Sequence, residues 1–267
     1  MWSVLLVFVA LFAAAPGCRR PSGTEGAATL TVAGSTSVQP FAEKLAEHYM
    51  AAHPGLAINV QGGGSTAGVR AAETGAAQIG MSSRHLKDSE EALHQITIAL
   101  DGIAIIVNAA NPVAGLTRAQ VAAIFAGEVS RWSSVGGTDS PIHFVTREEG
   151  SGTRGAFEEM VMGKREIAPR ALVQDSNGAV REIVASDPNA LGYISLGLVD
   201  RRVRALAVDG VLPTHDAIVG KRYAVVRPFL FLTREEPAGA ARAFIEYVTG
   251  AEGQRLLGLE GLIPVRP

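Results

Sequence analysis

Residues 29–50 read TLTVAGSTSVQPFAEKLAEHYM and place a strand, a glycine–serine turn and a helix in one short stretch. Threonine alternates with apolar residues at the start, which predicts a strand over 29–34. Phe41, Leu45, Ala46 and Tyr49 have the spacing of one helix face, which predicts a helix over 41–50. Because a strand, a turn and a helix in succession form the repeating unit of an α/β fold, we expect that class for the chain.

The same alternation continues along the chain. Further strands are predicted at 56–61, 78–83, 96–108, 142–147, 191–196 and 224–233. Further helices are predicted at 67–74, 117–125, 153–162, 180–185 and 238–248. A length of 267 residues is too great for one small core and fits two lobes.

The charge balance and the cysteine count exclude several classes of protein. Lysine and arginine total 24 against 26 acidic residues, a net charge of −2, which argues against a nucleic-acid-binding protein. It also argues against a polybasic protein bound to a membrane surface. A single cysteine excludes an internal disulfide framework, and the six histidines show no metal-ligand spacing. We therefore expect no metal and no cofactor.

The N-terminus carries the pattern of an export signal. Residues 4–15 read VLLVFVALFAAA, an apolar run too short to span a bilayer but right for a secretory signal. Pro16, Gly17 and Cys18 follow and resemble a bacterial lipoprotein cleavage site. We predict a signal peptide at 1–17, a lipidated Cys18 and a flexible tether at 18–27. The alternative is a plain secreted protein, since Ala15 replaces the usual leucine and no basic residue precedes the run.

Four turns share a composition suited to anion binding. Glycine, serine and threonine gather between a strand and a helix at 34–37, 62–66, 150–153 and, less clearly, 175–178. Such turns direct free backbone N–H groups and the positive end of a helix dipole toward a ligand. The alternative for each turn is ordinary helix capping, which uses the same residue types. Four of them in one chain favour a shared anion site.

The turn REEGSGTR at 147–154 is the best defined of the four. Arg147 ends a predicted strand, so its guanidinium can lie over the turn and bind an oxyanion through parallel hydrogen bonds. We expect Glu149 to hold that side chain in place; the alternative is a solvated charge cluster. The glycines at 150–155 also match a dinucleotide-binding pattern, which we reject because charged residues precede the first glycine where a buried strand should end.

Together these motifs resemble the PstS-type phosphate-binding proteins of bacterial phosphate ABC transporters. The resemblance rests on GSTSVQPF, GGGSTAG, IGMSSR, DGIAIIVN, REEGSGTR, LGYISL and RPFLFLT, which cover nearly the whole chain after the N-terminal segment. It implies a two-lobed, type II periplasmic-binding-protein fold with the ligand in the cleft between the lobes. One lobe would hold residues 28–109 and 225–267, and the other would hold 110–224.

The resemblance also implies the phosphate ligands. In this sequence they would be Thr36, Ser37, Ser65, Ser83, Arg147, Ser151, Gly152 and Thr153. Many relatives carry an aspartate at the position of Ser83, where the carboxylate accepts a proton from the ligand. We expect Asp101 to take that role here, with Glu149 and Asp175 as alternatives.

The expected function is therefore capture of inorganic phosphate outside the cytoplasm and delivery to the transmembrane subunits of an ABC permease. The protein is expected to be a monomer, held at the membrane through a lipid anchor only, and not an enzyme. One alternative is a binder of sulfate, molybdate or tungstate. The others are a phosphohydrolase with Ser151 as nucleophile and a sensory or scaffold lipoprotein of the same fold.

Overall fold

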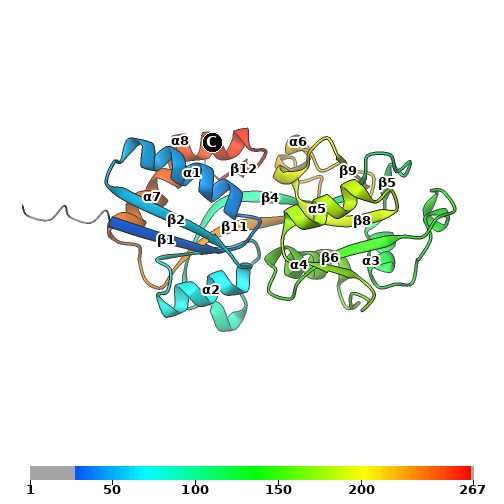
Figure 1. The fold of residues 1–267 in the computed structure, drawn as a ribbon, viewed down its shortest axis with the longest axis horizontal. Coiled ribbons are helices and arrows are strands. Elements are labelled where there is room, and N and C mark those ends of the chain that lie inside the picture. The colour runs from blue at the N-terminus through cyan, green and yellow to red at the C-terminus, as the bar shows by residue number, and fades with distance from the viewer. Residues whose placement is uncertain (1–27, 266–267) are drawn as a thin grey trace, which may run out of the picture.

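The computed structural model describes residues 28–265, which form two lobes lying side by side (Figure 1). The signal peptide predicted at 1–17, the lipidation of Cys18 and the tether predicted at 18–27 lie outside the described residues. Within 28–265, no helix is both long enough and apolar enough to cross a membrane.

Strands and helices alternate as the sequence pattern predicts. The strands are β1 (Ala28–Gly34), β2 (Leu56–Gly62), β3 (Ile79–Ser82), β4 (His94–Asn108), β5 (Gly115–Leu116), β6 (His143–Arg147), β7 (Leu172–Gln174), β8 (Ala190–Ser195), β9 (Val203–Ala205), β10 (Ala207–Val208), β11 (Val226–Thr233) and β12 (Ile263–Pro264). The helices are α1 (Gln39–Ala52), α2 (Ser65–Thr74), α3 (Arg118–Phe125), α4 (Gly152–Phe157), α5 (Asn177–Ser186), α6 (His215–Val219), α7 (Gly239–Thr249) and α8 (Ala251–Leu259).

The first lobe is built on the strand order β2-β1-β3-β11-β4. β1 runs parallel to β2 and β3, whereas β11 runs antiparallel to β3 and β4. Helices α1, α7 and α8 pack on one face of this sheet, and α2 packs on the other (Figure 1). On β11, Phe229 and Phe231 face the three helices while Leu230 and Leu232 face α2, because successive strand residues point to opposite faces.

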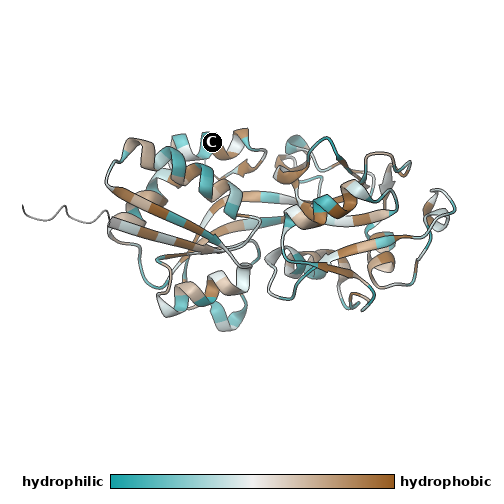
Figure 2. Cartoon of the chain, in the orientation of Figure 1, coloured by the Kyte–Doolittle hydropathy of each residue, from teal (hydrophilic) through white to brown (hydrophobic). Residues whose placement is uncertain are grey.

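The second lobe continues the sheet in the order β4-β8-β6-β7, with β9 also paired to β4. Ile103, Ile105 and Val107 of β4 pack into a core shared with α3, α4 and α6. Ala104 and Ile106 point the other way, onto α5. A strand covered on both faces must be apolar throughout, which is why this part of β4 reads as a continuous hydrophobic run (Figure 2).

Two strands cross between the lobes. Residues 94–102 of β4 pair with β11, and residues 103–107 pair with β8. Ala99 belongs to the core of the first lobe and Ile103 to that of the second, so the crossing lies between them. The boundary predicted at residue 109 is therefore too late, because β4 is one continuous strand that passes through the hinge and ends inside the second lobe. The return crossing lies between Val225 and Phe229.

The structure differs from the sequence prediction at the end of α4 and in the C-terminal helix α8. The helix predicted at 153–162 is α4, which ends at Phe157 and continues as a π-helical turn over Glu158–Met162. Helix α8 was not predicted, since two glycines interrupt its pattern. One of them, Gly253, lies where a Cβ would approach the Cα of Val248 within 2.6 Å, so that glycine serves helix packing.

A candidate anion-binding site between the lobes

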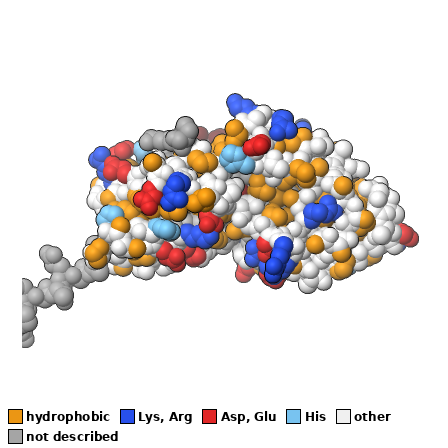
Figure 3. Space-filling model, turned by 90° about the horizontal axis from the view of Figure 1, so that it is seen from above, with side chains coloured by type: hydrophobic (Ala, Val, Ile, Leu, Met, Phe, Trp, Pro, Cys, Tyr) orange, Lys and Arg blue, Asp and Glu red, His pale blue; other side chains and the backbone are white. Residues whose placement is uncertain are grey.

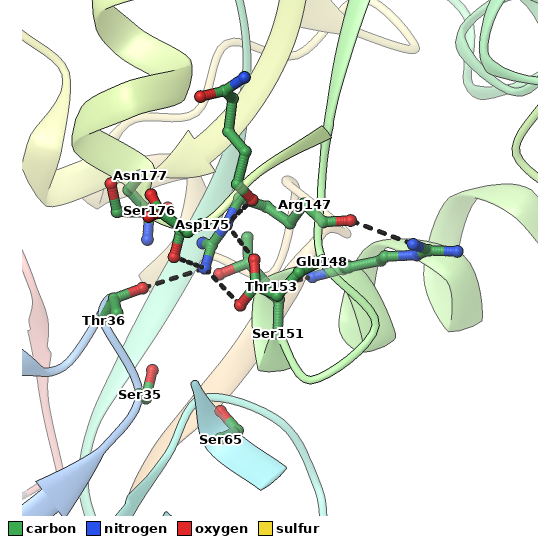
Figure 4. Close-up of polar contacts among 12 residues, drawn as sticks. Ser35, Thr36, Ser65, Arg147, Glu148, Ser151, Thr153, Asp175, Ser176 and Asn177 are labelled. Atoms are coloured by element: carbon green, nitrogen blue, oxygen red, sulfur yellow. Dashed lines mark hydrogen bonds and ion pairs between the residues drawn. The ribbon is translucent and has the colours of Figure 1, made fainter. Parts of the chain in front are cut away.

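Five chain segments meet where the two lobes touch, and Figure 4 labels residues of four of them. The first lobe contributes the turn after β1, the first residue of α2 and the turn after β3. The second lobe contributes the end of β6 with the start of α4, and the start of α5. The segments supply hydroxyl groups, one amide and one arginine, as follows: Ser35, Thr36, Ser37, Ser65, Ser83, Arg147, Ser151, Thr153 and Asn177.

Helix caps account for part of this composition. Ser151 Oγ accepts a hydrogen bond from the backbone N–H of Arg154 at 3.2 Å and caps α4. Ser176 Oγ accepts one from Ala179 N at 3.1 Å and caps α5. The capping alternative considered from the sequence thus holds for these two turns. Helix α2 differs, since its N-cap is Gly64 with φ 90 and no side chain caps it.

Arg147 is the charged centre of the site, and its side chain is 1% exposed. Its Nε and Nη2 each donate to a carboxylate oxygen of Glu148 at 3.0 Å. Nη2 also donates to Thr36 Oγ1 at 3.0 Å and to the Asp175 carbonyl at 2.9 Å (Figure 4). The residue that holds the arginine is therefore Glu148; the sequence-based choice of Glu149 was wrong, because Glu148 follows Arg147 directly and folds back along its guanidinium.

One nitrogen of this guanidinium remains free. Arg147 Nη1 is buried and has no hydrogen-bond partner within residues 28–265. Since Glu148 occupies the edge formed by Nε and Nη2, the donor left for a ligand is Nη1. A buried cationic N–H without an acceptor is costly, so the geometry is suited to an anion that supplies the acceptor.

Three serines of the first lobe form a connected hydroxyl cluster. Ser35 Oγ donates to Ser83 Oγ at 2.8 Å, and Ser65 Oγ lies 3.3 Å from Ser83 Oγ. Ser65 Oγ also accepts the backbone N–H of Ser83 at 3.0 Å. All three side chains are buried. Neutral hydroxyls that can rotate their protons offer hydrogen bonds to an anion without adding net positive charge.

The two lobes contact each other directly through the predicted residues. Ser37 Oγ lies 2.7 Å from Thr153 Oγ1 and accepts a hydrogen bond from Asn177 Nδ2 at 2.8 Å. The backbone N–H of Thr66 donates to the Gly150 carbonyl at 3.1 Å. The close approach of the two lobes requires glycine at residue 152. A Cβ there would lie 2.7 Å from Ser83 Oγ and closer still to Ser65 Oγ.

Asp101 lies behind this cluster in a buried ion pair. Arg227 Nε and Nη2 donate to Asp101 Oδ2 at 3.0 and 2.9 Å, and Ser195 Oγ donates to Oδ1 at 2.7 Å. Burial raises the pKa of Asp101, and the charge of Arg227 opposes that rise. Arg227 Nη1 also donates to the Ser83 carbonyl at 3.1 Å, which links the pair to the hydroxyl cluster. The role of Asp101 as proton acceptor stays a prediction.

The structure thus joins the predicted residues of both lobes in one cluster, with Asp101 connected through Arg227. Sequence reasoning missed five members: Ser35, Glu148, Asn177, Ser195 and Arg227. The sequence contains a signal for Arg227, because it is the one charged residue in the apolar run AVVRPFLFLT. Asp101 is likewise the one charged residue in ITIALDGIAIIVN. A charge inside a buried strand requires a partner, so each of these two residues predicts the other.

A separate groove lies beside the hinge and contains none of the predicted site residues. Its volume is about 710 Å³, and apolar residues of both lobes line it, among them Leu100, Ile218, Val219 and Ile263. Seen from above, apolar side chains gather between the lobes (Figure 3).

No cluster of metal-ligating side chains occurs in the part of the chain that the structure describes.

Comparison with known proteins gives consistent matches along the chain. The model of a PBP superfamily domain matches residues 20–252. The chain is 32% identical to the phosphate-binding protein PstS of Bacillus subtilis (strain 168), over 89% of this chain and 81% of that protein. A crystal structure of a putative phosphate ABC transporter substrate-binding protein with bound phosphate, from Clostridium perfringens, is 40% identical with a TM-score of 0.86 and covers 89% of this chain and 100% of its own. An ABC-type phosphate transport receptor from Vibrio cholerae is 41% identical with a TM-score of 0.74, over 88% and 99% of the two chains.

Proposed function

We infer the function of this chain from the premise that it belongs to the PstS phosphate-binding proteins, within the PBP superfamily. It binds inorganic phosphate between its lobes and delivers it to the transmembrane subunits of an ABC permease. The Clostridium perfringens relative, which holds phosphate and covers 89% of this chain, supports the ligand class. The observation in this chain that carries the proposal is the free, buried Nη1 of Arg147.

The chemistry of the site suits a tetrahedral oxyanion that carries a proton. Donors come from both lobes: Arg147 Nη1, backbone N–H groups at the start of α4, and the hydroxyls of Thr36, Ser37, Ser65, Ser83, Ser151 and Thr153. Glu148 already balances the charge of Arg147, so the site offers dipoles rather than a large positive excess. Hydroxyl oxygens in the site can also accept a hydrogen bond from the proton that phosphate carries at neutral pH and that sulfate lacks.

Capture proceeds by lobe closure. The hydrogen bonds of Ser37 with Thr153, and of Thr36 with Arg147, join proposed ligands of the two lobes. An anion placed among them contacts both lobes at once and therefore stabilises the arrangement in which the lobes touch. The two crossing strands, β4 and β11, act as the hinge for this motion.

The protein acts as a binder and not as an enzyme. The relatives reported above are solute-binding proteins. A phosphohydrolase would need a base beside Ser151, whereas Ser151 Oγ caps α4 and has no hydrogen bond to a histidine or carboxylate among residues 28–265. Absence of nitrophenol release from nitrophenyl phosphate, measured with the purified protein, is the expected result.

The protein works outside the cytoplasm as a monomer, anchored through a lipid on Cys18 after removal of residues 1–17. The apolar run and the small residue before the cysteine support this placement. The balanced charge of the chain supports a membrane contact made by the lipid alone, with no nucleic-acid partner.

Isothermal titration calorimetry with phosphate, sulfate, molybdate and tungstate tests the proposed ligand. We expect saturable binding of phosphate and at least about tenfold weaker binding of the other three anions, since none of them offers a proton at neutral pH. Tighter binding of sulfate, molybdate or tungstate would replace phosphate with that anion. No binding of any of the four would overturn the proposal.

A further inference from the structure

Besides Arg147, one more fully buried arginine lies at the base of the site. Arg227 and Asp101 stand directly opposite each other on the antiparallel crossing strands β11 and β4. Their side chains are 1% and 0% exposed. The Arg227 guanidinium also lies 5.3 Å from the centre of the Phe229 ring, which belongs to the core of the first lobe.

Three protein donors hold the carboxylate of Asp101. Arg227 Nε and Nη2 both donate to Oδ2, and Ser195 Oγ donates to Oδ1. An ionised carboxylate has about four acceptor positions, so most of them are occupied. In this geometry Asp101 acts on the site mainly through its charge.

The pair is tied to the anion site on both sides. Arg227 Nη1 donates to the carbonyl of Ser83, whose hydroxyl belongs to the first-lobe cluster. In the second lobe, Ser195 N donates to Asn177 Oδ1, and Asn177 Nδ2 donates to Ser37. Burial lowers the pKa of Arg227, and the positive charge of Arg147 adds to that lowering. The two arginines are therefore close enough to interact.

We propose that Arg227 is a positioning residue whose charge neutralises Asp101, so that a buried negative charge does not oppose the anion. This inference rests on the proposed phosphate binding. Without Arg227, Asp101 would keep only the hydrogen bond from the hydroxyl of Ser195. The ionised Asp101 carboxylate would then repel a bound phosphate, and the low dielectric of the protein interior would strengthen that repulsion.

The charged and titratable groups around Asp101 define the expected pH dependence. Arg227 faces it from β11, and Tyr223 lies nearby, where burial and then the charge of Asp101 raise the pKa of its phenol. Ser195, the last residue of β8, contributes a neutral donor. Arg147 and Tyr193 act on the pair through Arg227. Burial raises the pKa of Asp101 and the charge of Arg227 opposes that rise, so removing the cation should raise this pKa further toward neutral pH.

The test compares Arg227→Met, which keeps the side-chain bulk, with the double variant Arg227→Met, Asp101→Asn. The dissociation constant for inorganic phosphate is measured by calorimetry from pH 5.5 to 8.5 for both variants and the wild type. Dividing each value by that of the wild type at the same pH removes the titration of phosphate itself. We expect this ratio to rise at least about tenfold with pH for Arg227→Met and to stay flat for the double variant.

A flat ratio for Arg227→Met, or an equal rise in the double variant, would overturn the charge-balance role. Arg227→Lys keeps the charge but loses the planar fork, so its ratio should also stay flat. If Arg227→Met does not fold by circular dichroism, Asp101→Asn decides the matter: it leaves the Arg227 charge uncompensated and should strengthen phosphate binding about threefold or more. Unchanged or weaker binding would refute the inference. Failure of the wild type to bind phosphate would instead overturn the proposed function.

Discussion

Replacing Arg147 with alanine tests the centre of the proposed site. The free nitrogen Nη1 can make a charge-assisted hydrogen bond to the ligand, which is worth about 1.5–3 kcal/mol. That energy corresponds to about a 10- to 150-fold loss of phosphate affinity. Glu148 would also lose its partner, and its side chain is 32% exposed, so water can hydrate the remaining carboxylate. The unpaired negative charge of Glu148 would also repel phosphate, so we expect a loss of phosphate affinity near the upper end of this range.

The same substitution removes structural hydrogen bonds. Arg147 donates to the carbonyls of Gln174 and Asp175, which hold the strand β7 and the start of α5. We therefore expect the free energy of unfolding to fall by about 1–3 kcal/mol, because two partly buried hydrogen bonds are lost, each worth about 0.5–1.5 kcal/mol. Thermal melts without ligand measure this loss separately from the loss of binding.

Calorimetry with phosphate is the assay, and two variants serve as controls. Arg147→Lys keeps a positive charge without the planar fork and should retain only part of the affinity. Arg118→Ala removes an arginine of the same lobe that forms an exposed pair with Asp209, and it should leave phosphate binding unchanged. If folded Arg147→Ala binds phosphate within twofold of the wild type, Arg147 does not contact the ligand.

Three further substitutions test other parts of the site and the chain. Gly152→Ala places a methyl group against Ser65 and should weaken phosphate binding about tenfold or more. Gly178→Ala, at the start of α5 where there is space, should leave binding unchanged. Equal phosphate affinities of the two variants would show that close contact of the lobes is not needed. Asp101→Asn should leave the phosphate-to-sulfate affinity ratio within about twofold, because three protein donors already hold the carboxylate. A tenfold gain of sulfate over phosphate would instead establish Asp101 as the acceptor of the ligand proton. Cys18→Ser should abolish incorporation of labelled palmitate in cells, and equal labelling of both forms would remove the lipid anchor from the proposal.

Much of the fold is predictable because its signals are local. The alternation of apolar residues along β1 and the helical spacing of Phe41, Leu45 and Tyr49 are set by backbone geometry within a few residues. Glycine and serine at the turns indicate where helices begin, and Arg147 at the end of β6 is conspicuous beside them. The α/β class and most of the predicted site follow from these features and from the family resemblance that they carry.

Other features depend on which distant segments pack together. The lobe crossing in β4 lies near residue 102 because β11 pairs up to that point and β8 pairs beyond it, and neither partner is encoded locally. The choice of Glu148 over Glu149 depends on how the chain turns after β6, since adjacent side chains diverge. Likewise, Arg147 Nη1 can be identified as free only from the structure, once the hydrogen-bond partners of Nε and Nη2 are known.

The ion pair of Asp101 with Arg227 shows the division most clearly. Sequence alone determined that each charge sits in an apolar run and therefore needs a partner, because a lone buried charge is strongly destabilising. Only the tertiary structure decided that the two residues, 126 positions apart, are partners, because the antiparallel register of β4 and β11 sets them opposite each other. Strand periodicity fixes which face a side chain takes, but the register between strands is fixed by packing over the whole lobe.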